Sequence, residues 1–209
     1  MMYPHRIPRW IQSLFPRYQW VKPGDTPTLY LTFDDGPIPK VTPWVLEILA
    51  QYQVPATFFW VGANVERHPE IAREVVAQGH AIGNHSHTHK KGWRTRTSAY
   101  LDDVAKAQTA IAEVVGKPIT LFRPPYGRIT PAQSKQLGLA YDLVMWSVLS
   151  GDFDSGLSPA ACLAGTQKAT QNGGIVVFHD SLKAEKRLRA VLPAYIEWAL
   201  AQGYQFSAL

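Results

Sequence analysis

The chain has 209 residues, of which 46% are hydrophobic, 11% are aromatic and 18% are charged, and its formal net charge is +5 at pH 7. This composition excludes a disordered chain and allows one globular domain with a sizeable core. The positive charge suits an ordinary surface, an anionic polymer or a membrane surface, and no nucleic-acid-binding motif accompanies it, so we expect no nucleic-acid partner. The single cysteine, Cys162, excludes an internal disulfide and a cysteine-rich metal site, and we expect it in the core.

Residues 1–27 are expected to form an arm or packing segment ahead of a single domain at 28–209. The apolar stretch of this arm, 10–15, is interrupted by polar residues and falls short of the about 7–15 apolar residues of a secretory signal. No window of the chain approaches the ~20 apolar residues of a membrane span. We therefore expect a cytoplasmic or peripherally membrane-associated protein, with the bacterial envelope left open.

A short amphipathic helix is predicted within the arm. Its apolar face would carry Trp10, Ile11, Leu14 and Phe15, with Arg6, Arg9 and Arg17 beside it. We expect this face to pack on the domain. The alternative is a peripheral membrane contact through residues 6–17, because an apolar face flanked by arginines also suits a lipid–water interface.

Apolar, β-branched and aromatic runs alternate with helical patterns along the rest of the chain. Strands are predicted at 28–33, 55–61, 80–83, 119–122, 140–146, 174–178 and 203–206. Helices are predicted near 41–52, 67–78, 96–115, 130–137, 158–170 and 184–202. This alternation predicts an α/β fold with a parallel sheet, open or closed into a barrel, whose chemistry gathers at the carboxyl ends of the strands.

Polar motifs directly follow five of the predicted strands. They are DD at 34–35, GNHSHTH at 83–89, RPPYG at 123–127, SGDFD at 150–154 and HD at 179–180. Because parallel strands end at one rim, these side chains are expected to converge on one site. The cations that follow the last motif are expected to form a solvated helix face, and they are Lys183, Lys186, Arg187 and Arg189.

The histidine cluster predicts a divalent metal site. His85 and His89 are four residues apart and would face the same way on one helical turn, whereas His87 would point elsewhere. A carboxylate from Asp34 or Asp35 would complete a set of two histidines and one carboxylate, which leaves positions open for water and substrate. The other carboxylate would be a general base beside a water whose pKa the metal lowers. Neighbouring residues at a strand end point in opposed directions, and these residues alone do not assign the two roles.

Together, TFDDG, H-S-x-x-H, RPPYG, the DF of 152–153 and VFHD resemble the five ordered motifs of the polysaccharide deacetylase family, the NodB-homology carbohydrate esterases of family 4. The resemblance covers about residues 28–209. It implies a distorted (β/α) barrel, consistent with about seven parallel strands. It also implies a hydrolase that removes acetyl groups from an N-acetylated glycan, such as peptidoglycan, chitin or a chitooligosaccharide. The implied cofactor is a divalent metal, zinc before cobalt, nickel or manganese.

The resemblance also implies a role for each matching residue. Asp34 would be the general base, and Arg123 would hold it ionised. The metal ligands would be Asp35, His85 and His89. His179 would be the general acid, kept cationic by Asp152. The backbone N–H of Tyr126 would help to stabilise the oxyanion of the tetrahedral intermediate.

Two positions depart from the usual motifs of the family, and both are expected to line the acetyl pocket. Phe153 stands where tryptophan is usual and Val177 where leucine is usual, so the pocket stays apolar while its width changes. Pro125 and Tyr126 are also expected beside the substrate. Trp146 is expected either to stack on a sugar ring or, as we favour, to pack in the barrel.

Two other functions fit the same scaffold. One is an amidase that acts on a small nitrogen metabolite, and the complete set of Asp35, His85 and His89 argues against it. The other is a catalytically silent glycan-binding module, and the retained base and acid, Asp34 and His179, argue against that.

Overall fold

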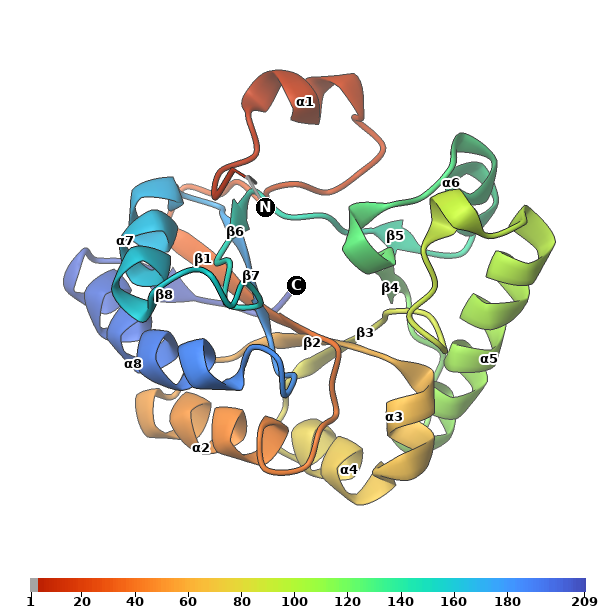
Figure 1. The fold of residues 1–209 in the computed structure, drawn as a ribbon, viewed down its shortest axis with the longest axis horizontal. Helices are drawn as coiled ribbons and strands as arrows, with labels where there is room; N and C mark the ends of the chain where they lie inside the picture. Colours follow the sequence, from red (N-terminus) through yellow and green to blue (C-terminus); the bar gives the residue numbers. More distant parts are fainter. Residues whose placement is uncertain (1–3) are drawn as a thin grey trace.

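The computed structural model describes residues 4–209, so residues 1–3 of the predicted arm lie outside the described part. Its centre is a parallel sheet that curls into a half-barrel with helices around the outside (Figure 1). The strands are β1 (Thr28–Asp34), β2 (Thr57–Trp60), β3 (Ala81–Asn84), β4 (Leu121–Phe122), β5 (Asp142–Leu143), β6 (Val148–Leu149), β7 (Ile175–His179) and β8 (Gln205–Phe206). The strand order is β5-β4-β3-β2-β1-β7-β6, and β8 pairs with the start of β1. The predicted distorted parallel barrel is confirmed.

The helices and strands follow the predicted pattern with two differences, one in a helix and one in a strand. They are α1 (Arg9–Leu14), α2 (Thr42–Tyr52), α3 (Gly62–Arg67), α4 (Pro69–Ala77), α5 (Thr97–Val115), α6 (Pro131–Leu137), α7 (Pro159–Ala169) and α8 (Glu185–Ala201). The helix expected near 67–78 is present as α4, and the short helix α3 before it was not predicted; the chain leaves helical geometry at His68, and Pro69 begins α4. The strand expected at 140–146 is two short strands, because the Met145 N–H turns away to the Gln19 carbonyl of the arm.

Alternation along β1 separates the core from the interior of the barrel. Leu29, Leu31 and Phe33 belong to the main hydrophobic cluster, to which buried residues of α2 and α8 also belong. Thr32 and Asp34 instead reach the Arg123 side chain. Successive side chains of a strand face opposite sides. The apolar residues of β1 therefore face the outer helices, and Asp34 faces the interior of the barrel at its rim.

The arm closes the opening between β5 and β6, which lie at the two ends of the strand order. Gln19 pairs in parallel with Val144, and Arg6 pairs antiparallel with Val148. Between these two pairings, α1 has no buried residue. The expectation that the apolar face of this helix packs on the domain is therefore wrong, because backbone pairing of the flanking residues holds the arm. None of the helices within residues 4–209 is long and apolar enough to cross a membrane.

Candidate metal and catalytic site

Three side chains at the carboxyl ends of β1 and β3 form a possible metal site. The ligand atoms of Asp35, His85 and His89 all lie within 4.8 Å of one another. Asp35 Oδ1 lies 3.2 Å from His89 Nε2 and 3.9 Å from His85 Nε2, and it is buried without a hydrogen-bond partner among the described residues. An unpartnered buried carboxylate oxygen facing two imidazole nitrogens is the arrangement that a divalent cation would satisfy.

The protonation of His85 and of Asp35 also suits a metal site. His85 Nδ1 lies 2.7 Å from the Arg123 carbonyl, so Nδ1 carries the proton and Nε2 offers its lone pair to the site. Burial lowers the pKa of His85 to about 4, which leaves the ring neutral at pH 7. Burial acts to raise the pKa of Asp35, but His89, His179 and His85 outweigh it and hold that pKa below its usual range. The set therefore combines two histidines with an ionised carboxylate.

Left-handed backbone, not a helical turn, brings these residues together. Asp35 has φ +87°, which turns its side chain toward the side that Asp34 already faces. Both carboxylates consequently reach 3.9 Å from His85 Nε2, and the expectation of opposed directions is wrong. His85 and His89 lie in a loop in which Ser86 and His89 also have positive φ, so the expected helical turn is wrong too. His87 points away, to Glu66, as predicted.

Asp34 is held from one side and open on the other. Arg123 Nη1 donates to Asp34 Oδ1 at 2.6 Å and to Thr32 Oγ1 at 2.7 Å, and Arg123 Nη2 donates to the Met145 carbonyl at 3.0 Å. The guanidinium has no exposed surface and lies 4.0 Å from the centre of the Phe59 ring. One carboxylate oxygen of Asp34 is thus fixed by a buried cation, while Oδ2 faces the histidines.

Across the rim, a second carboxylate holds His179. Asp152 Oδ1 lies 2.8 Å from His179 Nδ1, and Asp152 Oδ2 accepts the His179 backbone N–H at 2.7 Å. Burial acts to lower the pKa of His179, but Asp152, helped by Asp35 and Asp34, raises it to about 9. The imidazole is therefore cationic at pH 7, with its Nδ1 proton committed to Asp152.

Two residues with structural roles at the rim were missed by sequence reasoning. Arg187 was expected on a solvated face, but it is buried and donates to the Asp152 carbonyl. Asp180 is fully buried, where its Oδ1 accepts the Gly36 N–H at 3.0 Å and its Oδ2 accepts the Thr42 hydroxyl at 2.6 Å. Burial raises the pKa of Asp180 to about 8. The only sequence signal for Asp180 was its place directly after His179.

Of the residues expected beside the substrate, Tyr126 and Phe153 border the site and Trp146 does not. The Tyr126 ring lies 4.6 Å from the His89 ring, and the Phe153 ring lies 5.2 Å from that of His179, so both border the site. Val177 is buried two residues before His179 on β7, and Pro125 is buried beside Tyr126. Trp146 instead packs against two interior hydrophobic clusters, where a Cβ on Gly127 would come within 2.7 Å of its ring. This favours packing over sugar stacking for Trp146.

A groove of about 440 Å³ opens beside Asp35 and His89. Its walls come from α3 and from the loops after β1, β2, β3 and β7, and they include Ile38, Val61, Asn64, Arg67 and Leu182. The exposed Tyr126 ring, which contacts His89, lies 4.7 Å from Lys91 Nζ, and the exposed Trp93 ring lies 5.3 Å from the Arg128 guanidinium. The site is therefore bordered by a groove and by aromatic and cationic side chains.

Comparison with known proteins agrees with this geometry. The family model described as polysaccharide deacetylase matches residues 21–141. A peptidoglycan-N-acetylglucosamine deacetylase of Bacillus cereus is 33% identical over 189 residues, which are 90% of this chain and 88% of the relative. A chitooligosaccharide deacetylase of Bradyrhizobium sp. is 39% identical over 74% of this chain and 71% of its own length.

Longer relatives and solved structures are similar as well. A peptidoglycan-N-acetylglucosamine deacetylase of Listeria monocytogenes is 34% identical over 84% of this chain, and the chain spans only 36% of that relative's length. The crystal structure of the Bc1960 peptidoglycan N-acetylglucosamine deacetylase superimposes with a TM-score of 0.88 at 28% identity, covering 92% of this chain and 91% of the other. The likeness thus extends over nearly the whole described fold.

Proposed function

The chain belongs to the polysaccharide deacetylase family, and on that premise we propose that it hydrolyses the N-acetyl groups of a glycan. One observation carries the proposal. The Asp34 carboxylate and the cationic His179 imidazole lie at paired positions of β1 and β7, and Asp35, His85 and His89 form a possible metal site at the same rim. Amide hydrolysis needs a base to activate water and an acid to protonate the departing nitrogen, and Asp34 and His179 offer these two groups at one rim.

We assign the metal to Asp35, His85 and His89. The family is metal-dependent, and the unpartnered Asp35 oxygen, the lone pair of His85 Nε2 and the nearby His89 Nε2 fit a divalent cation. Two histidines and one carboxylate suit zinc first, with cobalt, nickel or manganese as substitutes. When bound, such an ion supplies Lewis-acid polarisation of the acetyl carbonyl and lowers the pKa of water.

Asp34 is proposed as the general base. Its Oδ2 faces the reaction centre and would accept the proton of the attacking water, while the Arg123 guanidinium holds Oδ1 in place. Because Arg123 also bonds Thr32 and Met145, the base cannot rotate away without breaking buried hydrogen bonds. The fold therefore fixes the direction in which the base points.

His179 is proposed as the general acid. With Nδ1 held by Asp152, the proton on Nε2 is the one available to the departing amine. The backbone N–H of Tyr126, whose ring contacts His89, is proposed as an oxyanion donor. Phe153, Val177 and Pro125 are proposed to border the acetyl methyl.

Peptidoglycan is the glycan that we propose first. The relative of similar length in Bacillus cereus carries that name, and the cations Lys91 and Arg128 beside the exposed rings of Tyr126 and Trp93 suit a sugar polymer with carboxylate substituents. A chitooligosaccharide, which lacks carboxylates, would use the rings alone.

For the place of the reaction we propose peripheral association with a lipid surface, and helix α1 carries that proposal.

Acetate release tests the activity. The protein would be assayed on peptidoglycan, chitooligosaccharides and acetylxylan, after chelation and after re-addition of zinc. We expect release from an N-acetylated glycan that chelation abolishes and zinc restores. Release only from a small amide metabolite would favour the amidase, and binding of glycan without release in the zinc-loaded protein would favour the silent module. Asp34→Asn is the matched control, because it conserves shape and removes the base.

A further inference from the structure

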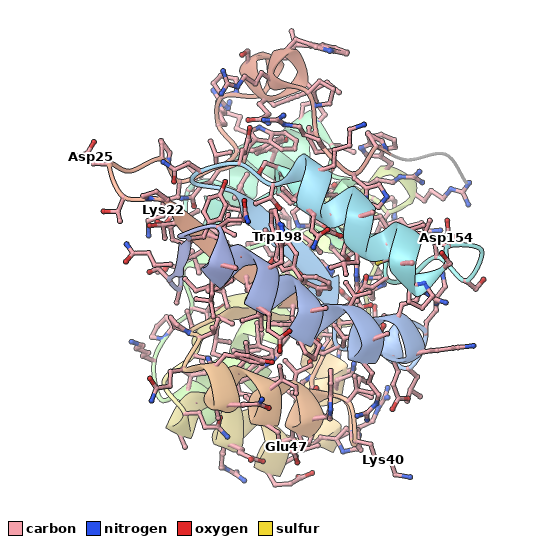
Figure 2. All side chains as sticks on the ribbon, turned by 90° about the vertical axis from the view of Figure 1, so that its left-hand side faces the viewer. Lys22, Asp25, Lys40, Glu47, Asp154 and Trp198 are labelled. Carbon is pink, nitrogen blue, oxygen red and sulfur yellow. The ribbon has the colours of Figure 1, made fainter. Side chains whose placement is uncertain are left out.

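Helix α1 leaves its apolar face uncovered. Trp10 is 66% exposed, Leu14 is 65% exposed and Phe15 is 48% exposed. Figures 1 and 2 show the helix standing off the wall of the barrel in two perpendicular views. Large apolar side chains gathered on one short element indicate an interaction surface, whereas scattered ones do not.

The helix is held in this position from both sides. The Ile7 N–H donates to the Ser147 carbonyl at 3.0 Å. On the other side, the Gln19 N–H donates to the Leu143 carbonyl at 2.9 Å, and the Met145 N–H donates to the Gln19 carbonyl at 2.8 Å. The segment between these anchors is therefore a loop with two fixed ends, and its apolar side chains are presented at the tip.

The charged side chains of the arm before Asp25 are all cationic. Exposed cations surround the helix in sequence, and they are Arg6, Arg9, Arg17 and Lys22. Residues 1–24 contain no aspartate or glutamate. Tryptophan favours the interface of a bilayer, and arginine extends its charge to the headgroups while its stem stays in the apolar layer.

We propose that α1 and its flanking arginines form a docking site for an anionic lipid surface. Trp10, Leu14 and Phe15 would enter the boundary between headgroups and acyl chains, and Arg9 and Arg17 would contact the headgroups. A second copy of the chain fits less well. A stable protein interface buries about 800 Å² on each partner, which is more than the exposed side chains of a six-residue helix offer. The proposal does not depend on the deacetylase activity.

Co-sedimentation of the full chain with vesicles tests this surface. We expect binding to vesicles with about one third phosphatidylglycerol, little binding to pure phosphatidylcholine, and release at high salt. Trp10→Ser with Leu14→Ser should abolish the binding. Arg9→Gln with Arg17→Gln should weaken the partition roughly 30-fold, at about tenfold per 1.4 kcal/mol and about 1 kcal/mol for each cation.

Leu200→Ser on α8 is the matched control, since Leu200 is another exposed apolar residue and its variant should bind as the parent does. Thermal unfolding of every variant shows that the fold is retained. Equal binding of the Trp10/Leu14 variant and the parent, or no binding by the parent, would overturn the proposal. Self-association in solution that the same variant removes would assign the face to a second copy and overturn it as well.

Discussion

The catalytic rim buries its polar side chains, whereas helix α1 exposes its apolar side chains. Arg123, Asp152 and Asp180 have no exposed surface, and each is held by two or more hydrogen bonds. Trp10 and Leu14 of α1 are mostly exposed. Burying a polar group costs free energy unless the group is hydrogen-bonded, so the fold must hold each of these rim side chains at hydrogen-bond distance from its partners. The comparison teaches that substitutions at the rim should alter chemistry and stability, and that substitutions on α1 should alter neither.

The largest effect is expected at the two adjacent aspartates. Asp34→Asn leaves Asp35, His85 and His89 in place but removes the proposed base, so turnover should fall by about 10²–10⁴-fold while metal content stays near stoichiometric. Asp35→Asn weakens a ligand, so metal content and turnover should fall together and excess metal should partly restore both. Acetate release and elemental analysis of the same samples measure the two effects.

The reverse outcome would exchange the roles of Asp34 and Asp35. Full activity in both variants would contradict the proposed mechanism. It would also contradict the expectation that substitutions at the rim, unlike those on α1, alter the chemistry.

A smaller effect, on pH dependence, is expected from Asp152→Asn. Asp152 is the main group that raises the pKa of His179 to about 9, and the protonated ring is the proposed acid. Turnover of the parent should therefore fall as pH rises through about 9. In the variant this alkaline limb should move toward the ordinary histidine pKa of about 6.5. Asp25→Asn, on the exposed part of the arm, is the control and should leave the limb unmoved.

The protonation of His179 also makes the free energy of unfolding depend on pH. Because the folded-state pKa of His179 lies above its unfolded value, its contribution to the free energy of unfolding is fully present below about pH 6.5 and is lost as pH rises through about 9. Asp152→Asn should remove this dependence. Denaturant unfolding across that range measures it, and an unchanged pH dependence in the variant would show that Asp152 does not set the charge of His179.

Gly36→Ala should cost stability at the rim. A Cβ at Gly36 would lie 2.0 Å from Asp180 Oδ2, so the carboxylate that holds this loop must move. We expect a loss of about 1–3 kcal/mol in the free energy of unfolding. A Cβ at Gly24 in the arm meets nothing within 4 Å, so Gly24→Ala should be neutral or slightly stabilising. Equal losses in both variants, measured in urea, would contradict the contrast between the two regions.

The smallest effect is expected from Trp10→Ser in the absence of lipid. Because the Trp10 side chain is mostly exposed, the free energy of unfolding should change by less than about 0.5 kcal/mol. Turnover on a soluble oligosaccharide should equal that of the parent. A loss above about 2 kcal/mol would mean that α1 packs on the domain in solution.

Much of this arrangement was predictable from the sequence. The strand–helix alternation and the polar motifs after five strands anticipated a parallel barrel with one polar rim. Local backbone choices were not predictable, because the positive φ of Asp35 and His89 breaks the usual direction of side chains at a strand end and in a helical turn. Arg187 was expected at the surface because it lies among other cations in the sequence. Its burial depends on Asp152, which is distant in sequence.

The closure of the barrel by the arm has a consequence for synthesis on the ribosome. His5, at the start of the arm, contacts the Leu149 carbonyl 144 residues later in the chain. The arm therefore emerges before its partners and pairs with them only after Leu149 has been made, a long-range pairing that is slow to form. Throughout that interval α1 and its flanking cations are outside any completed fold, so this helix is available to a lipid surface or a chaperone before the barrel is closed.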